Sequence, residues 1–170
     1  MYREFETERL LIKPTTEKDA ELIYQLMNTP KFIKYVGDRE LNSIEDAEKY
    51  IKKKMLPQLD THGYSTYSLI RKSDGTKVGT CGLYDRDGLE GIDIGFGLLP
   101  KYEGLGYAYE GASILIKAGI EEFKIKKIQG ITSKENISSQ QLLVKLGLKI
   151  VGTTTLPYEN EELFLYEMKK

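Results

Sequence analysis

The sequence has one cysteine, one histidine and no tryptophan among its 170 residues. A single cysteine, Cys81, cannot form an internal disulfide, and no Cys/His cluster has the spacing of metal ligands. We therefore expect a reducing, cytoplasmic environment and no metal. Cys81 lies between small residues of a strand pattern, which favours core packing over a nucleophilic role.

An excess of one charge is also lacking, because 25 Lys and Arg stand against 26 Asp and Glu. No basic surface for a nucleic-acid backbone is expected. Long apolar runs are missing: no segment approaches the roughly 20 apolar residues of a membrane span, and the N-terminus lacks the apolar stretch of a signal peptide. Without repeats or linkers, we expect one domain over residues 1–170 that binds neither nucleic acid nor membrane.

Alternating apolar residues and turn signals predict strands, and apolar residues three or four apart predict helices. The predicted strands are 9–13, 65–71, 77–84, 92–97, 127–133, 148–155 and 163–168. Two helices begin at Thr16 and Ser43, and two longer ones span 106–123 and 137–146. The order βααβββαβαββ indicates an α/β layered domain with a largely antiparallel sheet.

The most informative segment is 98–111, LLPKYEGLGYAYEG, in which a strand passes through a loop with Gly104 and Gly106 into a helix. This arrangement leaves N–H groups free at a helix N-terminus, where phosphate can bind, and glycine allows close approach. A purely structural tight turn is the alternative. The Walker pattern is absent, and Tyr109 occupies the sixth position of a dinucleotide fingerprint, where Gly or Ala is required.

The segment EGLGYA, residues 103–108, resembles the acetyl-CoA signature of the GNAT superfamily, Gln/Arg-x-x-Gly-x-Gly/Ala. The longer YEGLGYAYEG is similar to the form found in ribosomal-protein N-terminal acetyltransferases. This resemblance implies a GNAT fold, a mostly antiparallel mixed sheet flanked by helices, with acetyl-CoA as cosubstrate. Glu103 departs from the usual Gln or Arg. The resemblance implies cofactor contacts at Leu98, Leu99, Glu103, Gly104, Leu105, Gly106, Tyr107, Ala108, Asn136 and Ser139.

A second segment, NISSQQLLVKLGLKIVG at 136–152, resembles the family's Asn-x-x-Ser followed by a helix that ends Lys-x-Gly-Phe. The resemblance implies that Asn136 bonds coenzyme A and that Ser139 lies near the thioester. Helix capping alone is the alternative for both. Many family members have a Tyr proton donor where this chain has Leu143, so Ser139 becomes the candidate acid and Tyr102 a weaker one.

The resemblance also makes Asp93 the candidate general base, because it matches a Glu before Ile-Gly in the family's fourth strand. Asp93 alternates with apolar residues and should face away from them. A solvated strand face is the structural alternative, and Glu90 and Glu110 are nearby competitors. Main-chain N–H groups around Leu98 and Leu99 would polarise the thioester carbonyl.

We expect acetyl transfer to a primary amine, with a protein or peptide N-terminal α-amine as acceptor. Neutralising an α-amine at pH 7 costs about 1 kcal/mol, against about 4.6 kcal/mol for lysine. A small amine, a non-catalytic acyl-CoA-binding module and a nucleotide-binding regulator are the alternatives. His62 is expected at the surface, Tyr84, Tyr102 and Tyr109 cluster near the predicted cleft, and a homodimer is a further expectation.

Overall fold

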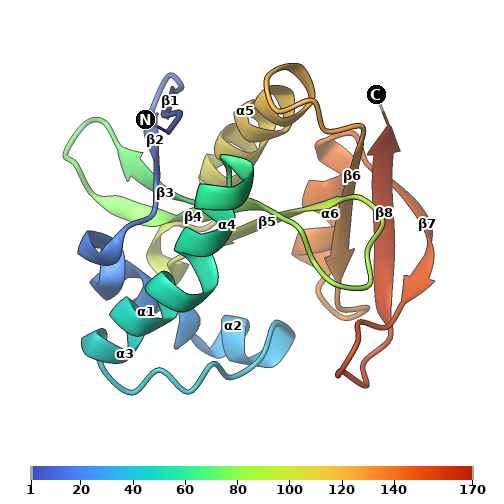
Figure 1. Ribbon diagram of the computed structural model, residues 1–170, viewed down its shortest axis with the longest axis horizontal. Coiled ribbons are helices and arrows are strands. Elements are labelled where there is room, and N and C mark those ends of the chain that lie inside the picture. Colours follow the sequence, from blue (N-terminus) through green and yellow to red (C-terminus); the bar gives the residue numbers. More distant parts are fainter. Residues whose placement is uncertain (1, 170) are drawn as a thin grey trace.

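The computed structural model describes residues 2–169, which form an eight-stranded sheet with helices on both faces (Figure 1). The strands are β1 (Phe5–Glu6), β2 (Leu10–Pro14), β3 (Thr66–Arg71), β4 (Lys77–Tyr84), β5 (Ile92–Leu98), β6 (Lys127–Thr132), β7 (Lys149–Thr154) and β8 (Leu163–Lys169). The α-helices are α1 (Ala20–Met27), α2 (Pro30–Tyr35), α3 (Ile44–Tyr50), α4 (Leu56–His62), α5 (Tyr107–Glu121) and α6 (Ile137–Lys145).

The sheet has the order β1-β2-β3-β4-β5-β6-β8-β7, and every neighbouring pair is antiparallel except β5 and β6. The parallel pairing consists of Ile92 opposite Ile128 and Asp93 opposite Gln129. Beyond Asp93, β5 stays paired with β4 as far as Leu98, whereas its pairing with β6 has ended. The sheet therefore opens between β5 and β6, and Asp93 lies where the two strands part.

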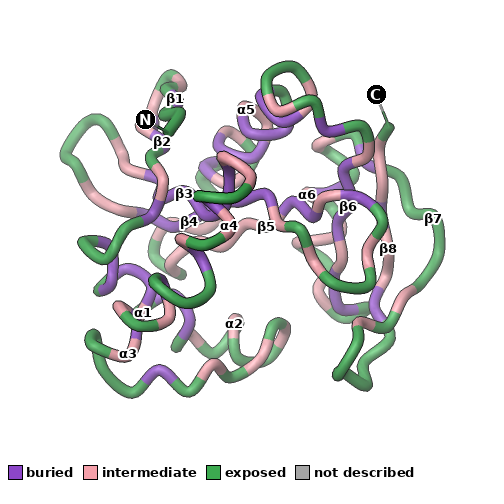
Figure 2. Tube along the Cα trace, viewed as in Figure 1, coloured by how far each residue is buried: buried purple, intermediate pink, exposed green. Residues whose placement is uncertain are grey.

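Helices α5 and α6 cover one face of the sheet and α1 covers the other. Ile94 of β5 belongs to the apolar core beneath α5, whereas a Cβ on Gly97 would lie 3.6 Å from Leu26 of α1. Because successive strand residues face opposite sides, these contacts place α5 and α1 on different faces. Figure 2 shows buried segments running through the middle of both layers.

Small residues allow α5 to lie close to the sheet. A Cβ on Gly111 would come within 2.8 Å of the Leu69 side chain of β3, and Ala112 and Leu115 beside it are fully buried. A second apolar cluster joins α1 to α3 through Ile23 and Ala47. The close contact between α5 and the sheet at Gly111 fixes where the N-terminus of α5 lies relative to β5.

The structure confirms the predicted fold class, and it adds elements that the sequence did not predict. The helix that Ser43 caps continues through a π-helical turn, Ile51–Met55, into α4. Helix α2, of six residues, and strand β1, of two, were missed. Cys81 is fully buried in the core, as expected.

Candidate functional site

The loop between β5 and α5 is shaped by two glycines. After the 3₁₀ turn Pro100–Tyr102, Gly104 has φ +77° and Gly106 has φ +86°. Side chains with a Cβ rarely adopt this left-handed region, so glycine is required at both positions. Gly106 is also the residue that precedes the first turn of α5. Backbone geometry therefore explains both glycines of the first motif.

The main-chain N–H groups of residues 104–109 are free. Within residues 2–169, none of them donates to a backbone or side-chain acceptor, and the first helical bond of α5 runs from Glu110 N–H to the Gly106 carbonyl at 3.0 Å. Free N–H groups at the start of a 15-residue helix carry partial positive charge. This donor set fits a diphosphate group, one of the anionic parts of acetyl-CoA.

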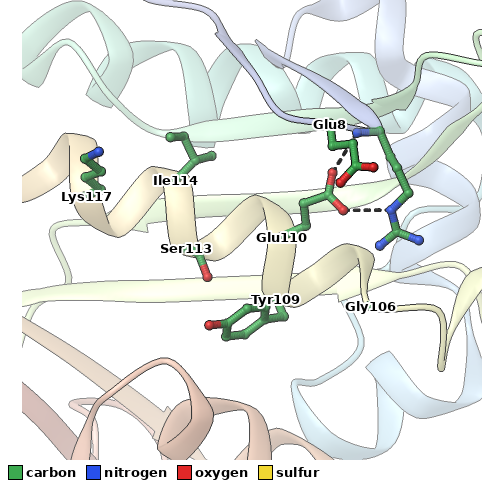
Figure 3. Close-up of a pocket in the computed structure, with 8 residues that line it drawn as sticks. Glu8, Gly106, Tyr109, Glu110, Ser113, Ile114 and Lys117 are labelled. Carbon is green, nitrogen blue, oxygen red and sulfur yellow. Dashed lines mark hydrogen bonds and ion pairs between the residues drawn. The ribbon is translucent and has the colours of Figure 1, made fainter.

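Arg9, just before β2, holds the start of α5 in place. Its guanidinium donates to the Leu105 carbonyl at 2.9 Å and to Glu110 Oε1 at 2.7 Å, and it lies 4.4 Å from the centre of the buried Tyr107 ring. Arg9 N–H donates to Glu110 Oε2 at 2.9 Å (Figure 3). Thr7 Oγ1 donates to the same oxygen at 2.5 Å. Charged hydrogen bonds from Arg9 thus stabilise the conformation of the loop and of the first turn of α5.

Glu110 is an unsuitable base because its oxygens are occupied by these donors. Burial alone would raise the pKa of Glu110, but the hydrogen bonds from Thr7 and Arg9 hold it below its ordinary value. Glu90, the other competitor, is largely exposed and pairs with Lys127 at 2.7 Å. Glu110 and Glu90 are therefore both engaged in ion pairs, which makes each a poorer candidate for the general base than Asp93.

An open depression of about 520 Å³ runs along α5 beside this loop. Figure 3 shows Tyr109 and Ser113 projecting from a different side of the helix than Glu110. The depression reaches Gly106 but not Asp93, Asn136 or Ser139; its lining residues are Glu8, Arg9, Gly106, Tyr109, Glu110, Ser113, Ile114 and Lys117. The depression is therefore continuous with the glycine loop at Gly106 and separate from the opening between β5 and β6.

Asp93 is buried at that opening, which differs from the solvated strand face considered as the alternative. Its side chain is 4% exposed, and Oδ2 accepts a hydrogen bond from Arg86 Nε at 2.5 Å. Oδ1 is buried and makes no hydrogen bond of normal geometry within residues 2–169. Burial raises the pKa of the Asp93 carboxyl above its ordinary value, although the Arg86 guanidinium and the Ile131 main-chain N–H oppose this shift. The buried carboxylate thus has one close cationic partner, on Oδ2, and a less completely bonded Oδ1.

The second motif forms the first turn of α6. Asn136 Oδ1 accepts hydrogen bonds from Ser139 N–H at 3.3 Å and from Ser138 Oγ at 3.2 Å, so the capping role considered for Asn136 is present. Ser139 is partly buried, and its hydroxyl does not take part in this cap. Leu143, where many family members have a Tyr, is buried against Gly130 of β6 and leaves no hydroxyl there.

Of the two expected carbonyl-polarising donors, Leu98 has the better geometry. Leu99 N–H donates to the Val78 carbonyl of β4 at 2.9 Å. Because peptide groups alternate in direction along a strand, the Leu98 N–H points to the other edge of β5, toward β6. Tyr102 packs against the main core, with the Arg71 guanidinium 5.2 Å from its ring centre.

The remaining polar residues near β5 lie on the same face as Asp93. The Tyr84 ring lies over Gly95, its hydroxyl is 2.9 Å from Thr66 Oγ1, and the Arg86 guanidinium is 4.9 Å from its ring centre. Burial raises the pKa of Tyr84 to about 12. His62 is the last residue of α4, and its Nε2 lies 2.9 Å from Asp85 Oδ2.

Sequence reasoning missed the cations that contact predicted site residues, among them Arg9 at Leu105, Arg86 at Asp93 and Lys31 at Glu103. Arg86 could have been found from the β4–β5 hairpin, whose register places Tyr84 opposite Asp93. No sequence signal connects Lys31 with Glu103, because they are 72 residues apart and belong to different elements.

The family model described as an acetyltransferase (GNAT) domain matches residues 9–149. The chain belongs to the GNAT acetyltransferase family. The match includes the glycine loop, Asp93 and the start of α6, so the resemblance at family level is confirmed. The narrower resemblance to ribosomal-protein acetyltransferases stays a prediction.

Relatives of this GNAT domain cover nearly the whole chain. The uncharacterized N-acetyltransferase YnaD of Bacillus subtilis (strain 168) is 25% identical over 146 residues, which cover 86% of this chain and 82% of the relative. The ribosomal-protein-S5-alanine acetyltransferase structure from Vibrio fischeri has a TM-score of 0.80 at 17% identity and covers 98% and 96% of the two chains.

The microcin C7 self-immunity acetyltransferase MccE, in complex with acetyl-CoA and AMP, has a TM-score of 0.80 at 18% identity. The match covers 96% of this chain and 94% of MccE. At these identities the two solved structures show a shared fold. Within residues 2–169 of this GNAT protein, no three His, Cys, Asp or Glu residues are placed to hold a metal, and no helix is long and apolar enough to cross a bilayer.

Proposed function

We propose that this protein transfers the acetyl group of acetyl-CoA to the N-terminal α-amine of a protein or peptide. The observation that carries the proposal is the set of free N–H groups at residues 104–109, beside a sheet that opens at Asp93. Two neighbours in fold support it, since one is described with acetyl-CoA and another acts, by its name, on a ribosomal protein.

In this proposal the loop binds the cofactor through its backbone. Gly104 and Gly106 admit the diphosphate to the N–H groups, and Arg9 keeps those groups in place through Leu105 and Glu110. Side-chain amide and hydroxyl groups of Asn136 and Ser139 lie at the first turn of α6, next to β6. The pantetheine arm would then lie in the opening between β5 and β6.

Asp93 accepts the amine's proton in this proposal. Its Oδ1 has no hydrogen bond of normal geometry within residues 2–169, and burial raises the pKa of the carboxyl, which makes the carboxylate a stronger base than an exposed aspartate. An α-amine with a pKa of about 7.7–8.0 requires only about 1 kcal/mol to become neutral at pH 7, whereas lysine requires about 4.6 kcal/mol. A carboxylate paired with Arg86 is therefore better suited to an α-amine than to lysine.

Acetyl-CoA, when bound, supplies the acetyl group as an activated thioester. The Leu98 N–H, which points toward the opening, is placed to donate to the carbonyl oxygen as charge develops there. Ser139 is the nearest hydroxyl of the second motif for protonating the sulfur, since Leu143 has none. Asp93 itself is only 3% exposed, so its carboxylate is largely shielded from bulk solvent.

The experiment is an acceptor panel with thiol release as the readout. The panel contains a peptide with a free N-terminus and an internal lysine, the same peptide acetylated at its N-terminus so that only the lysine amine remains, and a polyamine. We expect turnover with the free N-terminus at least ten times that with the other two. Preference for the polyamine would contradict the peptide acceptor, and binding of acetyl-CoA without transfer to any amine would indicate a non-catalytic module.

A further inference from the structure

Lys31 connects the two motif segments across the site. From α2, its ammonium Nζ lies 2.7 Å from Glu103 Oε2, before the glycine loop, and 3.3 Å from Ser138 Oγ, on the first turn of α6. Ser138 Oγ in turn donates to Asn136 Oδ1 at 3.2 Å. A continuous chain of polar contacts thus runs from one motif to the other, with a single cation at its centre.

The start of α2 is firmly placed, so this contact is defined by the backbone. Thr29 Oγ1 accepts from Phe32 N–H at 3.2 Å, and Pro30 stands in the first turn. Phe32 packs against the α1–α3 cluster, and Asn28 Nδ2 donates to the Leu41 carbonyl at 3.0 Å. The backbone that carries Lys31 is therefore anchored on both sides.

Glu103 presents a charge problem that Lys31 resolves. An anionic carboxylate at the edge of the free N–H groups of 104–109 would repel an arriving diphosphate. The ammonium of Lys31 neutralises that carboxylate, and it has three donors, of which Glu103 and Ser138 use two. The third donor remains available between the two motif segments.

We propose that Lys31 binds the diphosphate of acetyl-CoA directly, moving partly from Glu103 onto the phosphate oxygens when the cofactor arrives. Glu103 then orients the ammonium and lowers affinity when Lys31 is absent. This inference rests on the proposed function, because it assumes that the loop holds a diphosphate. It assigns the side-chain cation of the site to α2, outside both sequence motifs.

The test is calorimetric titration of acetyl-CoA into the full chain and its variants. Lys31→Ala should weaken binding roughly ten-fold, because a charged hydrogen bond to a half-exposed group is lost. Lys34→Ala, on the same helix with its ammonium 5.1 Å from the Tyr35 ring centre, should bind like the unchanged chain. Glu103→Gln should tighten binding about three-fold through the loss of repulsion.

A double variant separates direct binding from simple neutralisation of Glu103. In the Glu103→Gln background, Lys31→Ala should still weaken binding, by about three-fold or more, because the contact to phosphate is lost in either background and only the repulsion by Glu103 is gone. Disappearance of that penalty would overturn the proposal, since Lys31 would then act only on Glu103. Thermal unfolding of each variant should stay close to that of the unchanged chain, because exposed ion pairs contribute little.

A second ligand identifies the phosphate involved. The Lys31→Ala penalty should persist with 3′-dephospho-CoA, which keeps the diphosphate and lacks the 3′-phosphate. Loss of the penalty with this ligand would assign Lys31 to the 3′-phosphate and contradict the proposal. Failure of the unchanged chain to bind acetyl-CoA would instead reject the proposed function, whereas normal binding by Lys31→Ala would reject this inference alone.

Discussion

Two arginine–carboxylate pairs, one behind the glycine loop and one at the opening of the sheet, differ in how completely their carboxylates are bonded. Glu110 receives hydrogen bonds from Thr7 Oγ1 and from both the main chain and the guanidinium of Arg9. Asp93 receives one from Arg86 on Oδ2, and its buried Oδ1 receives none of normal geometry within residues 2–169.

The two pKa values move in opposite directions as a result. Glu110, whose donors outweigh its burial, has a lowered pKa, and Asp93, whose burial outweighs its single partner, has a raised one. A fully bonded carboxylate stabilises a structure, whereas a buried carboxylate with a free oxygen is suited to proton transfer. In the proposed function, cofactor binding thus depends on the backbone of the glycine loop and the hydrogen bonds that support it, and proton transfer depends on the Asp93 side chain.

The largest effect should come from the loop. In Gly106→Val, a β-branched residue would have to adopt φ +86°, with its Cβ 3.2 Å from Arg9 Nη2, so the loop would change shape and the converging N–H groups would separate. We expect affinity for acetyl-CoA, measured by calorimetry, to fall at least 100-fold, because several charged hydrogen bonds are lost.

Gly75→Val is the matched control for that change. Gly75 has φ +75° in the β3–β4 turn, with open space around its Cβ position. It carries the same backbone strain and should leave acetyl-CoA affinity unchanged, and circular dichroism should show both variants folded. Equal loss of affinity in both variants would attribute the Gly106 effect to general destabilisation.

The next largest effect should come from Asp93. Asp93→Asn removes the proposed proton acceptor, so turnover at pH 7 should fall about 100-fold. Turnover of the unchanged enzyme should decline as pH falls through the raised pKa of Asp93, because the protonated carboxyl cannot accept a proton. The variant should recover above pH 8, where an α-amine is largely neutral by itself.

Glu90→Gln is the control for Asp93→Asn, because Glu90 is an exposed carboxylate that precedes β5 and pairs only with Lys127 within residues 2–169. It should retain the turnover and the pH profile of the unchanged enzyme. An equal loss in Asp93→Asn at every pH would indicate that Asp93 serves to hold Arg86 and has no role in proton transfer.

The free energy of unfolding should depend on Glu110, the more completely hydrogen-bonded of the two carboxylates. Glu110→Gln should lower the free energy of unfolding at pH 7 by about 1–2 kcal/mol, because three donors lose an ionised acceptor. Since the folded-state pKa of Glu110 is lowered, this stabilisation is present above the unfolded value of about 4.3 and is lost as pH falls through the folded value. Denaturant unfolding at pH 7 and near pH 3 should show the gap closing, and a constant gap would contradict ionisation as its cause.

The smallest effect should come from Ser139→Ala. Its main-chain N–H keeps the cap to Asn136, so thermal unfolding should not change. We expect turnover to fall roughly three- to ten-fold, at the low end for a general acid, because solvent can also protonate a thiolate. Unchanged turnover would remove Ser139 from the catalytic residues.

The parts of the molecule that sequence predicted well are those set by local backbone rules. The helix over Tyr107–Glu121, the cap at Ser43 and the turn at Gly104 and Gly106 follow from residue types and their spacing. Helix α2 was missed because six residues are too few to establish a helical period. The alternation of β5 correctly predicted that Asp93 and Ile94 face opposite sides of the sheet.

The parts that sequence did not predict depend on which elements pack together. The burial of Asp93 follows from Arg86 and Tyr84 lying over the same face of the sheet, and alternation alone cannot distinguish a covered face from a solvated one. The contact of Lys31 with Glu103 requires α2 to lie beside the glycine loop. Such partners become visible only when the three-dimensional arrangement is known.

The most direct test of the central claim is a crystal structure of the protein with acetyl-CoA. We predict that diphosphate oxygens will accept hydrogen bonds from the main-chain N–H groups of residues 105–108, with the thioester in the opening beside Asp93. A diphosphate bound elsewhere, with those N–H groups left to water, would contradict the claim.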